Sequence, residues 1–246
     1  MDSNWVRGGA PAGGLHWEGP PDPTTQRAIV DMDQKFRQLW YLEQALEAAR
    51  SVGLVGFKHS NATATCFLVG PQLILTNHHV FESAADAAEG HVQFGYRELF
   101  NGDLTDPPVF DCDPAALFVT NEALDYSLVA LAASPGLPYL KLRHGDATEL
   151  ESHIAIIQHP DGAPLQVASR DNSLVWQSAQ ALQYLTNTEY GSSGAPVFND
   201  YWRVIALHSK RVQDPAVSGR EVWYRNQGTR VSAILADPRV SAALPA

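Results

Sequence analysis

The sequence predicts an all-β fold preceded by one helix. From Leu54 onward, short apolar runs alternate with Gly, Pro, Asn and Asp residues, which is typical of many short strands joined by turns. A Ser-Pro-Gly-Leu-Pro break at residues 134–138 divides these runs into two series, so we expect two barrels or sandwiches in succession. The chain has 246 residues, of which 45% are hydrophobic, and this fits one two-barrel domain or two small domains.

The region before the strands consists of two segments of different composition. Residues 1–25 are rich in Gly and Pro, so we expect them to be extended or disordered. In residues 26–52 apolar residues recur at helical spacing, with Thr25 suited to the start of a helix and Gly53 to its end. The apolar stripe consists of Met32, Phe36, Leu39, Leu42, Leu46 and Ala49. We expect it to pack on the outside of the barrel; the alternative is an adaptor or pro-segment that docks a regulatory protein partner.

The apolar runs place the two halves of the fold. The first series occupies residues 65–69, 73–75, 92–94, 117–119 and 127–131. The second series occupies residues 154–157, 165–168, 182–185, 196–198, 204–207 and 229–234. We therefore assign residues 53–135 to a first β-barrel and residues 136–246 to a linker and a second β-barrel.

Charge and targeting features exclude several classes of partner. The formal net charge is -10 at pH 7, which argues against non-specific nucleic-acid binding and against binding to an anionic membrane surface. Residues 1–21 contain no basic region followed by an apolar stretch, so no signal peptide is visible, and no apolar run reaches membrane-spanning length. We expect a cytoplasmic protein without nucleic-acid or membrane partners.

The two cysteines, Cys66 and Cys112, are interpreted as buried, reduced thiols. Without an export signal, reduced thiols are the simpler expectation, and cysteine is often buried. A disulfide or a metal site is the alternative, but no Cys-x-x-Cys or paired His/Cys spacing supports a metal. We expect no metal site and no cofactor.

Three motifs carry the chemistry of a serine nucleophile. Residues 191–198 read Gly-Ser-Ser-Gly-Ala-Pro-Val-Phe, and the flanking glycines let the backbone turn sharply and direct its N–H groups at one point. An apolar run at residues 73–75 leads to the pair His78 and His79, and Asp125 precedes another apolar run. A histidine can accept a serine proton at neutral pH, and an acid can orient the imidazole.

These motifs resemble those of the trypsin-like serine peptidases, and within them the bacterial glutamyl-endopeptidase-like branch. The resemblance is carried by residues 76–80, by Asp125 with its Leu-Val-Ala-Leu continuation, by residues 157–162 and by residues 191–198, and it covers roughly residues 52–235. It implies two six-stranded antiparallel β-barrels of chymotrypsin type, an active site in the cleft between them, and hydrolysis of protein or peptide substrates without a cofactor.

The family pattern selects one residue from each motif. The nucleophile directly precedes the second glycine, which favours Ser193 over its neighbour Ser192. The general base directly precedes a small apolar residue, which favours His79 over His78. The backbone N–H groups of Gly191 and Ser193 are then expected to form the oxyanion hole, each donor contributing about 3 kcal/mol of transition-state stabilisation.

The third member of the predicted triad is Asp125. It should hold the imidazole in the productive tautomer and stabilise its cation. Asp125 alone introduces a strand-like apolar run, whereas the other acids in this part of the chain fit solvated carboxylates. Those alternatives are Asp86, Asp103, Asp106, Asp111 and Asp113.

The resemblance also implies a preference for acidic substrates. In the glutamyl-endopeptidase branch, a threonine five residues before the nucleophile and a histidine fifteen residues after it bind the substrate carboxylate; here these are Thr188 and His208. Ser209 is expected among the substrate-binding residues with them. The resulting prediction is cleavage after Glu and then Asp. The alternative is that Thr188 and His208 are ordinary buried strand residues.

Two departures from the family pattern stand out. Ser192 occupies the place of the aspartate that pairs with a new N-terminal amine in digestive members, so that switch cannot operate in the same way. Either the oxyanion loop, which carries the Gly191 and Ser193 donors, forms without cleavage of the chain, or another mechanism forms it. Cys66 replaces a glycine of the usual Gly-Thr-Gly-Phe-Leu strand. A catalytically silent binding module and a latent protease activated by a partner are the alternative functions.

Overall fold

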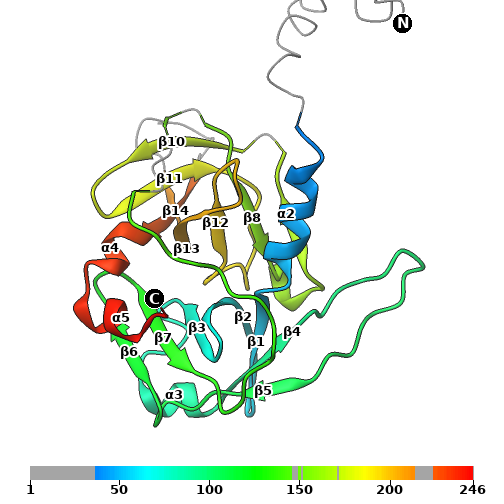
Figure 1. Cartoon of the computed structure of the whole chain (residues 1–246), viewed down its shortest axis with the longest axis vertical. Coiled ribbons are helices and arrows are strands. Elements are labelled where there is room, and N and C mark those ends of the chain that lie inside the picture. The colour runs from blue at the N-terminus through cyan, green and yellow to red at the C-terminus, as the bar shows by residue number, and fades with distance from the viewer. Residues whose placement is uncertain (1–36, 146–148, 151, 171, 214–223, 246) are drawn as a thin grey trace, which may run out of the picture. The chain divides into compact units, whose positions relative to one another are not determined.

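A computed structural model describes residues 37–145, 149–150, 152–170, 172–213 and 224–245. Most of the regular secondary structure in the described chain is β-strand, arranged as two curled antiparallel sheets with short helices around them (Figure 1). The predicted all-β fold of two successive barrels is therefore confirmed. Residues 1–25, predicted to be extended, and residues 26–36 of the predicted helix lie outside the described residues.

The first sheet uses strands from the N-terminal half, in the spatial order β5-β4-β1-β2-β3-β7-β6. Its strands are β1 (Val52–Phe57), β2 (Ser60–Gly70), β3 (Leu73–Thr76), β4 (Gly90–Phe94), β5 (Val109–Asp111), β6 (Phe118–Asn121) and β7 (Tyr126–Ala130). Helix α3 (Ala84–Ala88) follows β3, and a capping box between Ser83 and Asp86 starts it.

The second sheet repeats this arrangement in the C-terminal half, in the order β10-β11-β14-β13-β12-β8-β9. Its strands are β8 (Ala155–Gln158), β9 (Gln166–Ala168), β10 (Ser173–Gln177), β11 (Ala181–Leu185), β12 (Pro196–Phe198), β13 (Val204–Gln213) and β14 (Tyr224–Arg230). A short 3-10 turn, η3 (Pro160–Gly162), links β8 to β9. Over the described residues each sheet has seven strands rather than six and ends in a three-residue edge strand, β5 or β9.

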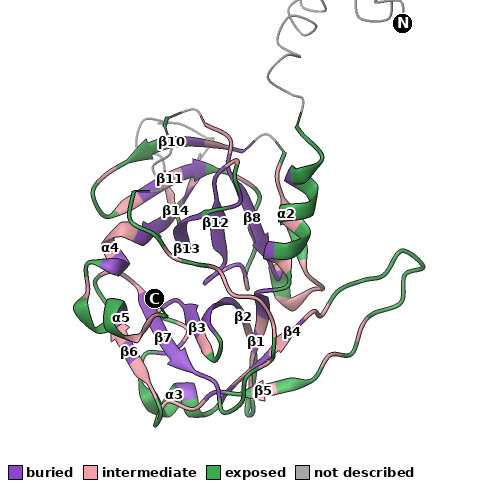
Figure 2. Ribbon diagram, viewed as in Figure 1, coloured by how far each residue is buried: buried purple, intermediate pink, exposed green. Residues whose placement is uncertain are grey.

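Three apolar clusters hold these sheets together. One lies within the first half and includes Cys66 and Cys112, which are both buried and not bonded to each other. A second lies within the second half around Tyr184. The third combines residues of both halves, among them Phe67 and Phe198, so the two barrels share a common core. Figure 2 shows the buried strands meeting at this junction.

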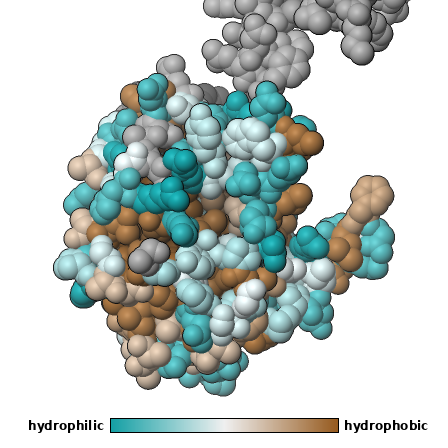
Figure 3. All heavy atoms as spheres, viewed as in Figure 1, coloured by the Kyte–Doolittle hydropathy of each residue, from teal (hydrophilic) through white to brown (hydrophobic). Residues whose placement is uncertain are grey.

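Helix α2 (Trp40–Ala49) packs on the barrels with a different face from the predicted one. Tyr41 and Ala48 are buried, and the Tyr41 ring lies 5.1 Å from that of Trp202, centroid to centroid. The stripe residues Leu42 and Leu46 are instead 58% and 68% exposed. Figure 3 shows apolar side chains on the outer side of α2. The expectation that the stripe faces the barrel is thus wrong for its described leucines, because an aromatic ring and small alanines pack more closely there.

Two predicted boundaries differ from the structure. Gly53 does not end the helix: α2 ends at Ala49, and Gly53 lies inside β1, where a Cβ would lie 2.6 Å from a methyl carbon of Val92. Residues 229–234 do not form one strand, because β14 ends at Arg230 and helix α4 (Val231–Leu235) follows. The buried positions 231, 234 and 235 have helical spacing, which the strand prediction overlooked.

The C-terminal helices are attached to the first half of the chain. Helix α5 (Pro238–Ala243) begins after Asp237, whose carboxylate accepts a hydrogen bond from the backbone N–H of Arg239. The same carboxylate accepts a 2.6 Å hydrogen bond from the Tyr126 hydroxyl on β7. In the part of the chain that the structure describes, no helix is both long and apolar enough to span a bilayer.

Candidate active site

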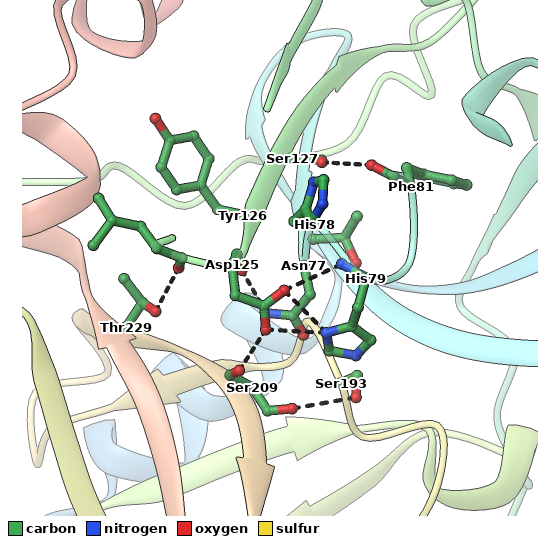
Figure 4. Close-up of polar contacts among 12 residues, drawn as sticks. Asn77, His78, His79, Phe81, Asp125, Tyr126, Ser127, Ser193, Ser209 and Thr229 are labelled. Carbon is green, nitrogen blue, oxygen red and sulfur yellow. Dashed lines mark hydrogen bonds and ion pairs between the residues drawn. The ribbon is translucent and has the colours of Figure 1, made fainter. Parts of the chain in front are cut away.

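The fold brings His79, Asp125 and Ser193 together at the junction of the two sheets (Figure 4). His79 lies just beyond β3, Asp125 directly before β7, and Ser193 in the turn before β12. His79 Nδ1 lies 3.0 Å from each carboxylate oxygen of Asp125, and the His79 backbone N–H donates to Oδ1 at 3.1 Å. The acid therefore holds both the ring and the main chain of the histidine.

Ser193 lies on the other side of the imidazole from Asp125 (Figure 4). Its hydroxyl donates a long 3.5 Å hydrogen bond to the Ser209 carbonyl oxygen, and among the described residues no hydrogen bond joins it to His79. A serine hydroxyl can change rotamer, and catalytic hydrogen bonds are often loose before substrate binds. With Nδ1 engaged by Asp125, Nε2 is the ring nitrogen left for the Ser193 proton.

Asp125 has the left-handed backbone conformation, with φ at 50°, and several groups fix it there. The buried Asn77 side chain donates to its carbonyl oxygen at 2.9 Å, and the Ser209 hydroxyl donates to Oδ2. Burial alone would raise the pKa of the Asp125 carboxyl, but hydrogen bonds from His79 and Ser209 outweigh it and hold this pKa below its usual range. Asp125 is therefore a carboxylate ready to stabilise an imidazolium.

The alternative residues of the two doublets point elsewhere. His78 Nδ1 makes a 2.8 Å hydrogen bond with the Thr120 hydroxyl, and Figure 4 shows this ring turned away from Ser193. Ser192 is fully buried, and its hydroxyl accepts a 3.1 Å hydrogen bond from the Glu189 backbone N–H. Neither side chain is free to act as base or nucleophile in this arrangement.

The two predicted oxyanion donors have no competing acceptor. Over the described residues, the backbone N–H groups of Gly191 and Ser193 donate to no protein atom. Gly191 has φ at +84°, and a Cβ there would lie 2.6 Å from the His159 carbonyl oxygen. Glycine is required at this position both for its conformation and for the close approach of another backbone segment.

The predicted substrate-binding residues Thr188 and His208 are each engaged by a neighbouring side chain. The Thr188 hydroxyl donates to Asn226 Oδ1 at 2.8 Å, and His208 Nδ1 lies 2.7 Å from the Tyr184 hydroxyl. Thr188 and His208 are each 4% exposed. Burial lowers the pKa of His208 to about 3, so its imidazole is neutral at physiological pH. The Ser209 side chain contacts Asp125 rather than this group, and its predicted contact with substrate stays a prediction.

Comparison with known proteins identifies the family. Residues 64–207 match the family model described as a trypsin-like peptidase domain. The chain belongs to this family. It is also 34% identical, over 252 residues, to the uncharacterized protein y4fB of Sinorhizobium fredii (strain NBRC 101917 / NGR234). That match covers 83% of this chain but 38% of y4fB, so the chain spans less than half the length of this relative.

Solved structures share the fold of this trypsin-like peptidase domain at low sequence identity. An inactive mutant of Rv3671c from M. tuberculosis H37Rv superposes with a TM-score of 0.60 at 13% identity, covering 93% of this chain and 98% of that one. A Glu endopeptidase structure gives 0.57 at 16% identity, covering 79% and 90%. A serine endoprotease from Yersinia pestis gives 0.57 at 16% identity, covering 82% and 65%. These matches confirm the expected chymotrypsin-type fold.

A cavity of about 650 Å³ opens directly beside His79 and Ser193. His79 and Ser193 line it together with the aromatic residues Phe57 and Tyr190 and the carboxylate of Asp161. A cavity of this volume accommodates side chains of an extended peptide. The His79 and Ser193 side chains are thus both reached from this cavity.

Sequence reasoning missed four residues that shape this site. Asn77 and Thr65 lie within segments that were recognised, but nothing in the sequence distinguishes their contacts with Asp125 and the oxyanion loop. Tyr184 lies in an apolar run, and Asn226 in a strand whose partners are distant along the chain. Each of these residues contacts a segment that is distant along the chain, so its place in the site can be recognised only from the structure.

Proposed function

We propose that this chain is a serine endopeptidase that acts through an acyl-enzyme at Ser193. The observation that carries the proposal is the pair of 3.0 Å contacts between His79 Nδ1 and the Asp125 carboxylate, with Ser193 on the opposite side of the ring. Membership in the trypsin-like peptidase domain family supports it. The substrates of such a domain are proteins or peptides.

The chemistry follows from this arrangement. Ser193 Oγ attacks the scissile carbonyl carbon while His79 Nε2 accepts its proton, and Asp125 stabilises the resulting imidazolium. The negative oxygen of the tetrahedral intermediate accepts hydrogen bonds from the Gly191 and Ser193 N–H groups. Collapse breaks the C–N bond, and the imidazolium gives its proton to the leaving amine. Water then attacks the ester with His79 again as base, which releases the acid and restores Ser193.

The substrate preference that we propose is Glu, then Asp, before the scissile bond. A neutral His208 that accepts a hydrogen bond from the Tyr184 hydroxyl at Nδ1 carries its own proton on Nε2, and no other described group engages that atom. An N–H donor at this position suits a carboxylate acceptor. The positive side chain of Lys210, which follows on β13, adds favourable potential, whereas that of Arg211 is paired with the Glu189 carboxylate at 3.2 Å.

The experiment is cleavage profiling with a peptide library, using wild type, Ser193→Ala, His208→Gln and the exposed control His144→Gln. We expect cleavage after Glu to exceed cleavage after Gln by about 100-fold, since unpaired polar groups penalise the wrong substrate. His208→Gln should reduce this ratio at least tenfold, His144→Gln should leave it unchanged, and Ser193→Ala should not cleave. Equal or faster cleavage after Lys or Phe would contradict the acidic preference while leaving the endopeptidase proposal intact.

The cytoplasmic setting and the regulatory partner at the N-terminal helix stay proposals. Fractionation of cells expressing the full chain tests the first of them directly. Peptide cleavage by the purified full chain alone tests the second, since a latent protease would be inactive without its partner.

A further inference from the structure

We propose that Thr65 is a positioning residue that locks the oxyanion loop, residues 190–194, in its active conformation without a new N-terminal amine. The loop is held against the turn at residues 159–162, named here the brace turn, and the Thr65 hydroxyl joins the two. This inference rests on the proposed function. It answers how the loop forms where Ser192 occupies the position of the usual aspartate.

Every polar group of Thr65 is used at the junction of the two barrels. Its hydroxyl donates to the Gly191 carbonyl oxygen at 2.8 Å and accepts from the His159 backbone N–H at 3.0 Å. Its backbone N–H donates to the Ser193 carbonyl oxygen at 2.8 Å, and its carbonyl accepts from the Thr76 hydroxyl at 2.9 Å. Thr65 has no exposed surface, so these are buried hydrogen bonds without water as a substitute.

Two further hydrogen bonds set the direction of the oxyanion donors, and Thr65 holds the peptide that follows each donor, through the Gly191 and Ser193 carbonyls. In a planar trans peptide the N–H points opposite to the preceding C=O. The Tyr190 carbonyl accepts from the Asp161 backbone N–H in the brace turn, so the Gly191 N–H points away from that turn. The Ser192 carbonyl accepts from the Ala195 N–H at 3.1 Å, which sets the Ser193 N–H in the same way. Reversal of either peptide would break one of these bonds.

The brace turn is itself rigid enough to serve as an anchor. Asp161 has φ at 53° and Gly162 has φ at 70°, so the turn has a specific left-handed conformation. His159 is fully buried, and its Nδ1 lies 2.9 Å from the Ala163 carbonyl oxygen. The oxyanion loop packs directly on this backbone, because a Cβ at Gly191 would lie 3.1 Å from the backbone nitrogens of Asp161 and Gly162.

Ser192 is held by uncharged hydrogen bonds at the position where digestive members of the family have an aspartate. Its buried hydroxyl accepts from the Glu189 N–H, and its own N–H donates to the Glu189 carbonyl at 3.2 Å. The loop therefore closes on itself at Ser192 and on the brace turn through Thr65. No charged group is involved in either set of bonds.

The test compares Thr65→Val, which keeps the shape but loses the hydroxyl, with Thr65→Ser, which keeps the hydroxyl. Ser134→Ala is the matched control, because that hydroxyl also donates to a carbonyl, Pro71 O at 2.8 Å, and accepts from a backbone N–H, that of Gly136. The readouts are kcat and KM on the best library peptide and the inhibition constant of a peptidyl boronate, whose tetrahedral adduct uses the oxyanion hole.

We expect Thr65→Val to lower kcat on the order of tenfold to 100-fold, with KM changed less than threefold, because a displaced oxyanion donor affects the transition state. Boronate affinity should fall by the same factor. Thr65→Ser should stay within threefold of wild type, and Ser134→Ala should equal wild type.

Thr65→Val with kcat and boronate affinity within twofold of wild type would overturn the inference. A similar loss in Ser134→Ala would also overturn it, as a general effect of losing a hydroxyl. If Thr65→Val does not fold by circular dichroism, Thr65→Ala takes its place under the same thresholds. A wild-type protein that neither cleaves peptides nor reacts with boronate would reject the proposed function, and the inference with it. If the wild type is active, the proposed function stands and the Thr65 variants test the inference alone.

Discussion

Gly194 offers a sharp test of the packing at the nucleophile, because its replacement by alanine has a matched control in Gly95. Both glycines are left-handed, with φ at +84° and +85°. A Cβ at Gly194 would overlap the Thr65 carbonyl oxygen and the Thr76 hydroxyl and would lie 3.1 Å from the Thr65 carbonyl carbon. A Cβ at Gly95 would meet nothing within 4 Å.

The two substitutions therefore share backbone strain but differ in steric overlap. Strain in the left-handed region, partly offset by the lower entropy of the unfolded chain, costs Gly95→Ala about 1 kcal/mol. Gly194→Ala also forces a buried backbone segment to move and weakens the bond between Thr65 and Thr76, so we expect a loss of at least about 4 kcal/mol.

Urea unfolding followed by tryptophan fluorescence measures both free energies of unfolding. For a chain of this size, about 4 kcal/mol corresponds to a lowering of Tm by roughly 10 °C. Gly194→Ala should also lose peptide cleavage, while Gly95→Ala should retain it. Losses of stability that agree within about 0.5 kcal/mol between the two variants would refute the described packing of the nucleophile turn.

Three further predictions follow from the same structure. Asp125→Asn should fold, because Asn tolerates a left-handed conformation. Steady-state kinetics should show a loss of about 10⁴-fold in kcat, because the amide would favour the wrong tautomer of the His79 imidazole. Burial lowers the pKa of His208 to about 3 and of His159 to about 4, so the unfolded chain binds more protons below pH 6.5. Stability should fall by about 2 kcal/mol per histidine between pH 6.5 and 5, and urea unfolding that is flat over this range would contradict it. Tyr41→Ala should cost about 3 kcal/mol whereas Leu46→Ala should cost less than about 0.5 kcal/mol, and the reverse order in thermal unfolding would show that α2 packs by its leucine stripe.

The residues of the predicted triad could be found from the sequence because each belongs to a local pattern. His79 ends an apolar strand, Asp125 begins one, and Ser193 lies between glycines that a tight turn requires. Two sheets formed by consecutive halves of the chain then bring these three ends to one junction. Local signals and simple topology located the three segments, and the family pattern then selected Ser193 over Ser192 and His79 over His78.

The supporting contacts could not be predicted, because they depend on the register between remote segments. Thr65 and Gly191 are 126 residues apart, and the hydroxyl between them has the same sequence context as any strand threonine. The face of α2 was also ambiguous, because periodicity identifies a helix but not which of two apolar faces packs. The contact of Tyr41 with Trp202 determines which face of α2 packs on the barrels, and the sequence does not reveal this contact.

Labelling with a fluorophosphonate, followed by intact-protein mass spectrometry, tests most directly that the residues at this junction form an activated nucleophile. We expect a single adduct on wild type that maps to Ser193, and no adduct on Ser193→Ala. In His79→Ala the rate of labelling should fall by roughly 1,000-fold or more. An unlabelled wild type, or equal labelling of wild type and Ser193→Ala, would contradict the proposed catalytic site.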